Sequence, residues 1–178
     1  PLLVFFGLIG ARAYHVANEP AFYLAHPLLI PAIWHGGLAI HGAVIVGALT
    51  LWYFAKKYKI EFFKLADCLF PSLMLGQAIG RWGNFFNQEL FGAPTSLPWG
   101  IFIDQANRPL GFEQFTHFHP AFLYEFIWNL IIVALITLWV TKKPPQKNGI
   151  IFGASLALWG LGRFLVELIR IDPAPIIF

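Results

Sequence analysis

Long apolar runs, separated by short polar segments, dominate the pattern of hydrophobic and polar positions in this chain. A helix that crosses a membrane needs about 20 mainly apolar residues. Five stretches meet that need in whole or in part, namely 1–17, 33–55, 65–85, 120–141 and 149–170. The pattern therefore predicts an all-α integral membrane protein with about five transmembrane helices, arranged as a single transmembrane domain over residues 1–178.

Two segments break the apolar pattern. Residues 17–32, "ANEPAFYLAHPLLIPA", contain three prolines and are typical of a loop or an interfacial segment. Residues 88–119 contain Pro94, Pro98 and Pro109, several glycines and the β-prone stretch "WGIFI". This second segment predicts a small extramembrane region with a short hairpin or irregular structure.

Composition agrees with a membrane protein: 58% of the residues are hydrophobic and 12% are charged. A soluble domain carries about 25% charged residues. The net charge of +3 does not indicate a nucleic-acid surface, because the lysines lie in two groups between apolar segments. These groups are Lys56, Lys57, Lys59 and Lys64, and Lys142, Lys143 and Lys147.

The lysine groups predict the orientation of the chain, because short cytoplasmic loops are rich in Lys and Arg. With both groups in the cytoplasm, the end of the third span, the 88–119 segment and the end of the fifth span all reach the opposite, outer face. The tail 171–178 is expected on that outer face as well.

The stretch "GQAIGRWGNFFNQELFG", residues 76–92, places an unusual number of polar side chains beside apolar spans. Arg81 and Asn84 are three residues apart and Asn84 and Gln88 are four apart, so a continuing helix would stack them on one face. The glycines at 76, 80, 83 and 92 would allow close backbone approach, or a helix break that exposes N–H groups to an anion. The stretch predicts either an anion site or polar contacts between helices.

A second polar group lies in "WGLGRFLVELIR", residues 159–170. The spacing of Trp159, Arg163, Glu167 and Arg170 predicts one helical stripe. Glu167 can pair with either arginine, and two arginines against one carboxylate leave a positive surplus. Such a surplus suits a phosphate, which guanidinium groups bind through two parallel hydrogen bonds. The alternative is that the Arg–Glu–Arg set only ties helices together.

Histidines supply the remaining candidates. His41, in "HGGLAIHGA", has small neighbours and could accept a proton near neutral pH. It could equally act as a hydrogen-bonding residue between helices. His117 and His119 have no Cys, Asp or Glu at ligand spacing, so neither a metal nor any other cofactor is expected.

These motifs together resemble the bacterial phosphatidylglycerol–prolipoprotein diacylglyceryl transferase family. The signature of that family, G-R-x-G-N-F-x-N-x-E followed by a glycine, is matched here by Gly80, Arg81, Gly83, Asn84, Phe85, Asn87, Glu89 and Gly92. "HGGLAIHGA", "HPAFLYE" and "WGLGRFLVELIR" resemble three further family segments, in the family's order. Trp159 stands where the family usually has a tyrosine.

The resemblance implies an enzyme that transfers a diacylglyceryl group from phosphatidylglycerol to a lipobox cysteine in the signal peptide of a prolipoprotein. Glycerol 1-phosphate is then released. Arg81 and Arg163 would bind the phosphate, Glu167 would orient Arg163, and His41 would be the base unless the phosphate takes the proton. Substrate contacts would come from Asn84, Asn87, Glu89, Gly92, Arg170 and Trp159.

The same resemblance places the protein in the bacterial plasma membrane as a multi-pass protein, among membrane lipids, with its site at the outer leaflet. Family members are longer, with about seven spans, so the chain is expected to lack the first spans and the last one. Two other functions stay open. A transporter of lipids or anions could use the same arginines as a headgroup site, and an inactive fragment or assembly subunit could use them to hold helices together.

Overall fold

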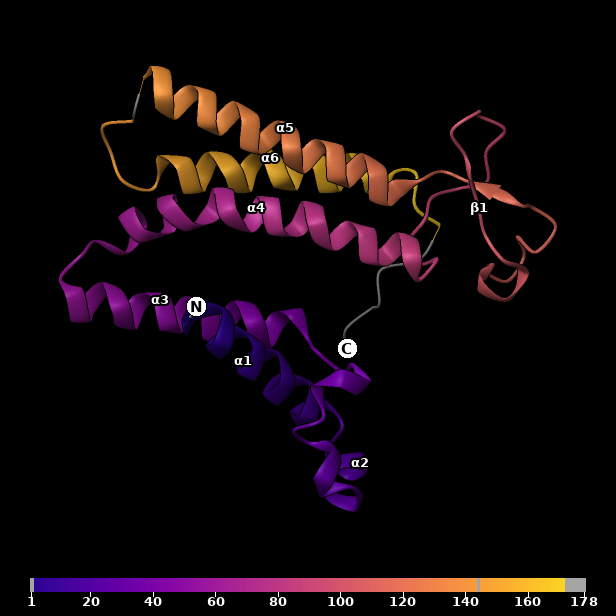
Figure 1. Cartoon of the computed structure of the whole chain (residues 1–178), viewed down its shortest axis with the longest axis horizontal. Helices are drawn as coiled ribbons and strands as arrows, with labels where there is room; N and C mark the ends of the chain where they lie inside the picture. The colour runs from indigo at the N-terminus through magenta and orange to yellow at the C-terminus, as the bar shows by residue number, and fades with distance from the viewer. Residues whose placement is uncertain (1, 144, 172–178) are drawn as a thin grey trace. The chain divides into compact units, whose positions relative to one another are not determined.

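The computed structural model describes residues 2–143 and 145–171 (Figure 1). Contacts divide the chain into two compact units, Pro1–Ala66 and Asp67–Phe178, and each is described by itself. The tail expected at the outer face lies outside the described residues from position 172 onward.

The first unit is a helical hairpin with an irregular connection. Its elements are α1 (Leu2–Asn18), α2 (Pro20–Ala25), the 3-10 turns η1 (Pro27–Leu29) and η2 (Ile33–His35), and α3 (Ile40–Tyr58). α1 and α3 pack closely where Gly10 meets Gly42, since a Cβ on Gly42 would overlap the carbonyl oxygen of Gly10. The two glycines therefore bring these helices together.

The prediction of a continuous span over 33–55 is wrong at its start, because α3 begins only at Ile40. Gly36 and Gly37 have φ of 83° and 70°, which a helix cannot contain. The buried guanidinium of Arg12 donates hydrogen bonds of 2.5–2.9 Å to four backbone carbonyls of this connection, those of Leu29, Ile30, Gly36 and Gly37. In a helix these carbonyls would accept from backbone N–H groups, and here they accept from the Arg12 guanidinium instead. These hydrogen bonds stabilise the irregular conformation of the connection.

The second unit is built on α4 (Phe62–Phe86), whose first turn belongs to the first unit, and on α5 (Ala121–Lys142) and α6 (Ile150–Glu167). Figure 1 shows these helices running side by side. Within the described ranges, they are the three helices long and apolar enough to cross a membrane. They coincide with the last three predicted spans, which stay predictions. α1 is apolar but has 17 residues, and α3 falls outside this group, so the first two spans stay predictions.

The interior of the second unit is apolar and packed from all three helices. Met74 of α4 and Ile132 and Ile136 of α5 are buried together. α5 and α6 approach closely at Gly162, where the Trp128 indole occupies the space that a Cβ would need. The Trp128 indole N–H donates to the carbonyl of Leu158 at 2.8 Å.

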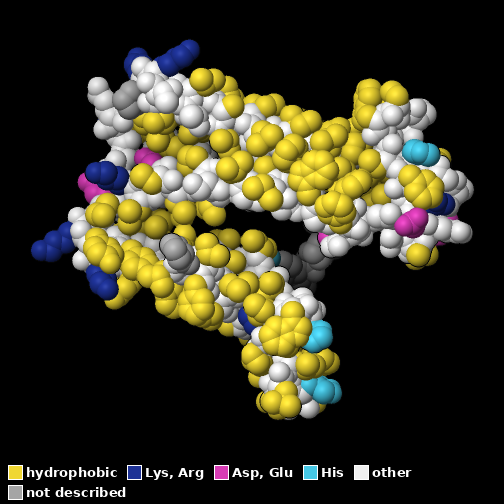
Figure 2. All heavy atoms as spheres, viewed as in Figure 1, with side chains coloured by type: hydrophobic (Ala, Val, Ile, Leu, Met, Phe, Trp, Pro, Cys, Tyr) yellow, Lys and Arg dark blue, Asp and Glu magenta, His cyan; other side chains and the backbone are white. Residues whose placement is uncertain are grey.

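The outside of these helices is also apolar. Figure 2 shows hydrophobic side chains over the visible face of α4–α6. Leu135 and Leu138 of α5 and Phe164 of α6 are at least half exposed. Exposed apolar side chains along whole helices are typical of a surface that faces lipid, where Leu and Phe lose nothing by contact with acyl chains.

A buried carboxylate fixes the start of α6. Asp67 of α4 accepts hydrogen bonds of 2.7 Å from the backbone N–H groups of Gly149 and Phe152. The first N–H groups of a helix have no partner inside it, and the helix dipole favours a negative charge there. Asp67 thus ties α4 to α6 at the end of the helices opposite Arg81.

Residues 88–119 form a small folded head, with β1 (Ile101–Phe102), η3 (Gln105–Asn107) and β2 (His117–Phe118). The strands are antiparallel, with Ile101 opposite Phe118, so the predicted short hairpin is confirmed. Phe91, Ile103 and Phe118 form the buried core of the head. The pKa of Glu113 is lowered, because its carboxylate accepts hydrogen bonds from its own backbone N–H and that of Gly111.

Candidate functional site

A carboxylate that pairs with two arginines joins the three long helices where they meet the head. Glu125, in the first turns of α5, lies 2.5 Å from Nη2 of Arg81 on α4 and 3.1 Å from Nη1 of Arg163 on α6. The Glu125 side chain is 12% exposed, so water screens these pairs only in part. Glu125 therefore sets the distance between the two arginines.

Glu125 was not predicted as a site residue, although the sequence carries a signal for it. It is the one charged residue of α5 before Lys142, in a helix that is otherwise almost entirely apolar. Charged side chains inside spanning helices are rare and usually functional. That signal identifies Glu125 without any knowledge of its partners.

A second carboxylate extends the cluster. Glu167 lies 2.6 Å from Nη2 of Arg163 and 3.3 Å from Nη1 of Arg170, so it pairs with both arginines, as the sequence suggested. The prediction that Arg170 shares a helical stripe is wrong, because α6 ends at Glu167. Arg170 instead forms a β-bridge with Gly92 of the head.

Amide side chains continue the network away from Arg81. Arg81 donates to Asn84 at 3.2 Å, and Asn84 donates to Glu89 at 2.9 Å. Asn87 donates to the same Glu89 oxygen at 3.2 Å. The polar residues of the 76–92 stretch therefore contact one another, and Glu89 is their common acceptor.

Gln88 does not stack with Asn84, contrary to prediction, because α4 ends at Phe86 and Gln88 has a φ of 51°. Its side-chain oxygen accepts hydrogen bonds from the backbone N–H of Asp104 at 2.8 Å and from the Asn107 amide at 3.1 Å. Gln88 thus anchors the head to the end of α4.

The glycines of the 76–92 stretch act differently from prediction. α4 is continuous through Gly76, Gly80 and Gly83, and no other helix or loop of the described residues comes within 4 Å of a Cβ at these three positions. At Gly92 a Cβ would stand 2.8 Å from the Cβ of His119. Gly92 is thus the glycine of this stretch where two backbone segments approach closely. Its β-bridge with Arg170 connects the head to the chain after α6.

His41 and Trp159 complete the predicted set. His41 lies exposed in the first turn of α3, in the first unit, with its ring centroid 5.8 Å from that of Tyr14. Its role as a base stays a prediction. Trp159 lies on α6 one turn before Arg163, and both line a small cavity together with Glu125.

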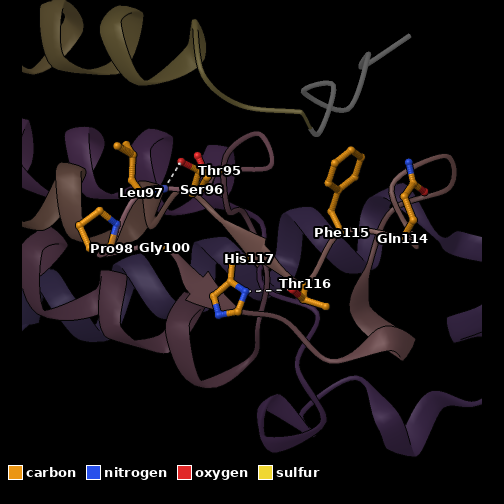
Figure 3. A pocket seen from close by; sticks show the side chains of 9 residues that line it. All are labelled: Thr95, Ser96, Leu97, Pro98, Gly100, Gln114, Phe115, Thr116 and His117. Atoms are coloured by element: carbon orange, nitrogen blue, oxygen red, sulfur yellow. Dashed lines mark hydrogen bonds between the residues drawn. The ribbon is translucent and has the colours of Figure 1, made fainter.

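The head contains an open pocket of about 450 Å³ (Figure 3). It is lined by Thr95, Ser96, Leu97, Pro98, Gly100, Gln114, Phe115, Thr116 and His117. No Lys, Arg, Asp or Glu is among these residues, so the pocket lacks the charge that a phosphate needs. In the described ranges no group of three or more His, Cys, Asp and Glu side chains could hold a metal.

The electrostatics of the cluster favour an anion. Three guanidinium groups, those of Arg81, Arg163 and Arg170, face two paired carboxylates, those of Glu125 and Glu167. The side chains of Arg81 and Arg163 remain 21% and 31% exposed. The cluster thus combines a positive surplus with accessible donors, which is the arrangement expected of a membrane protein that binds an anionic group at one membrane face.

Comparison with known proteins identifies the family to which the chain belongs. The family model of prolipoprotein diacylglyceryl transferase matches residues 2–178. The chain belongs to the prolipoprotein diacylglyceryl transferase family.

Individual relatives carry the name of the same enzyme. The phosphatidylglycerol–prolipoprotein diacylglyceryl transferase of Trichormus variabilis is 49% identical over 174 residues, covering 96% of this chain and 62% of the relative. The enzyme of the same name from Cutibacterium acnes is 45% identical over 179 residues, covering 97% and 59%. The Streptomyces coelicolor protein numbered 2 is 45% identical over 172 residues, covering 95% and 54%. The chain thus spans somewhat more than half the length of these relatives.

Proposed function

We propose that the protein transfers the diacylglyceryl group of phosphatidylglycerol to the lipobox cysteine thiol of a prolipoprotein. The names of the relatives, which give both phosphatidylglycerol and prolipoprotein, support this assignment. The observation that carries it is the cluster in which Glu125 holds Arg81 and Arg163 side by side. A phosphodiester headgroup is the anion that such a pair suits best at a membrane surface.

In the proposed reaction the cysteine sulfur attacks the glyceryl carbon that carries the phosphate. A carbon–sulfur bond forms and the carbon–oxygen bond to phosphate breaks, with its electron pair moving to the phosphate oxygen. Glycerol 1-phosphate leaves with one more negative charge than the phosphodiester had. Arg81 and Arg163 would stabilise this charge as it develops, which lowers the barrier.

The thiol must lose its proton to become a good nucleophile. His41 is the proposed acceptor, and the departing phosphate is the alternative. Either route balances the step, because one proton leaves the sulfur and one base receives it. A fully active His41→Ala variant would remove His41 from this role.

The remaining polar residues would support the two arginines. Glu167 would hold Arg163 in position through their 2.6 Å contact. Arg170 would add charge at the entry to the site. Asn84, Asn87 and Glu89 would hold the loop and contact the glycerol, while Gly92 would keep the backbone clear for the substrate. Trp159 would contact the substrate without the hydroxyl of the usual tyrosine.

The substrates imply where the site works. The lipid would enter sideways between helices, and the lipobox peptide would arrive at the outer leaflet of the bacterial plasma membrane. Charged residues in α4–α6 lie toward the helix ends: Arg81, Glu125, Arg163 and Glu167 at the head, and Lys64, Asp67 and Lys142 at the opposite end. A transporter would need such groups along the depth of the bundle, so this arrangement favours chemistry at one face.

A transfer assay with the protein expressed over its full reading frame tests the assignment. The protein would be supplied with phosphatidylglycerol labelled in its headgroup glycerol and with a lipobox peptide. The expected products are a thioether-lipidated peptide and labelled glycerol phosphate in equal amounts. The control peptide has serine in place of the lipobox cysteine and should release no label. Lipid binding without either product would contradict the proposal and would favour transport.

A further inference from the structure

A small cavity lies beside the Glu125–Arg163 pair, between α5 and α6. Its volume is about 10 Å³, which is room for about one water-sized group. Its lining consists of Glu125, Trp128, Asn129, Trp159, Gly162 and Arg163. The cavity therefore adjoins the arginine assigned to the phosphate, but it is too small for a phosphate.

Asn129 is the unexpected residue of this lining. Its side chain is 3% exposed, in a helix that otherwise buries apolar residues. It follows Glu125 by one helical turn, so the two side chains share a face of α5. A buried amide without partners costs roughly 1–3 kcal/mol, so its presence there needs an explanation.

Hydrogen bonding between the described residues does not provide that explanation. Trp128 is satisfied, because its indole N–H donates to Leu158. Glu125 and Arg163 are paired with each other at 3.1 Å. The Asn129 amide is therefore available to a molecule in the cavity that it lines.

We propose that this cavity receives a hydroxyl group of the headgroup glycerol of phosphatidylglycerol while the phosphate lies on Arg163. The inference rests on the proposed function. Three carbons of glycerol carry the phosphate and both hydroxyls, so a phosphate on Arg163 puts a hydroxyl within reach of the adjoining cavity. An amide matches a hydroxyl because each can both donate and accept hydrogen bonds.

The lining also discriminates between headgroups. The two oxygens of Glu125 are already paired with Arg81 and Arg163, so a headgroup ammonium would find no free carboxylate in the cavity. A headgroup without hydroxyls would leave Asn129 buried and unpaired. Sites built to bond a substrate hydroxyl reject analogues that lack it for this reason. Asn129 is therefore a specificity-determining residue for the headgroup.

The test compares two lipids in the transfer assay with the full-length protein. Phosphatidylglycerol has the hydroxyls, and phosphatidylpropan-1-ol has the same phosphate and carbon chain without them. The wild type should use phosphatidylglycerol with a kcat/KM at least about 10-fold higher. Asn129→Leu, which is similar in size, should lower kcat/KM for phosphatidylglycerol about 10-fold or more and leave that for phosphatidylpropanol within about 2-fold.

Thr137→Val is the matched control. Thr137 is an exposed polar residue of α5 whose hydroxyl bonds only to the Val133 carbonyl one turn earlier, so neither lipid should be affected. Equal use of both lipids by the wild type would overturn the proposal, and this result needs no variant. An equal loss with both lipids in Asn129→Leu would also overturn it, and would assign the cavity to a structural water. Failure of every lipid to yield thioether product would instead contradict the proposed function.

Discussion

At the residue scale, single charged side chains decide how the backbone and the site are arranged. Glu125 holds two arginines from two other helices, and Arg12 holds four carbonyls of an irregular connection. The arginines and amides of the site were predictable because they fall into short motifs. Glu125 and Arg12 belong to no such spacing, and their partners lie far away in sequence, so their contacts were not predicted, although the lone charge of Glu125 in an apolar helix is itself a signal.

Replacing Glu125 tests its role as the shared partner. Glu125→Gln keeps the size of the side chain but removes the negative charge between Arg81 and Arg163, which leaves Arg81 without its carboxylate partner and increases the repulsion between the two arginines. We expect kcat/KM for lipid transfer to fall about 10- to 100-fold, equivalent to about 1.4–2.7 kcal/mol. Glu113→Gln, the same change in the exposed head, should keep wild-type activity. Full activity of Glu125→Gln would show that the arginines do not need this carboxylate.

Replacing Arg12 tests the clamp on the first connection. Arg12→Met keeps much of the apolar stem and leaves four partly buried carbonyls without their charged donor, so we expect a loss of roughly 1–3 kcal/mol in the stability of this segment. Hydrogen exchange of the amides from 29 to 39 would measure the loss. Lys64→Met, on an exposed lysine, should leave exchange unchanged. Unchanged protection in Arg12→Met would contradict the clamp.

At the element scale, the long apolar helices were predictable and their ends were not. α4, α5 and α6 follow from continuous apolar runs of the length that a membrane span needs. The start of α3 was misplaced by seven residues, from 33 to Ile40, because "IWHGGLA" is apolar enough to pass as part of a span. The end of α6 was misplaced because Arg170 continues the helical spacing, although its backbone pairs with Gly92.

The capping of α6 by Asp67 gives a prediction at this scale. Asp67→Ala removes the acceptor for two N–H groups at the helix start, so we expect a loss of about 1–2 kcal/mol in the free energy of unfolding. Thermal unfolding of the purified protein in detergent would measure it as a lower midpoint. Asp104→Ala should unfold like the wild type, because Asp104 is bonded through its backbone N–H and carbonyl, which the substitution keeps. Equal midpoints for both variants would argue against the cap.

At the scale of the whole molecule, the charged residues define two ends of the helices of the second unit. The arginine cluster and the head lie at one end, and Asp67 and Lys142 lie at the other. The sequence predicted this gathering from lysine-rich loops, and contacts such as the bridge between Gly92 and Arg170 confirm it. The side of the membrane on which each end lies stays a prediction.

Cysteine labelling in intact cells would test that orientation. In a cysteine-free full-length background that includes Cys68→Ser, Leu110→Cys places a thiol on the exposed head and Lys142→Cys places one at the far end of α5. A maleimide that cannot cross the membrane should label position 110 in intact cells. Position 142 should react only after permeabilisation. The reverse pattern would put the head in the cytoplasm and would remove the proposed access for lipoprotein precursors.

In the proposed reaction the Arg163 guanidinium binds the lipid phosphate and stabilises the leaving group. Arg163→Lys keeps the positive charge but loses the planar pair of donors that now reaches Glu125 and Glu167. The most direct measurement is the turnover of phosphatidylglycerol by the full-length Arg163→Lys variant with a lipobox peptide. We expect a kcat about 100-fold below that of the wild type, in line with the loss of one donor to a developing charge. A turnover near that of the wild type would contradict it.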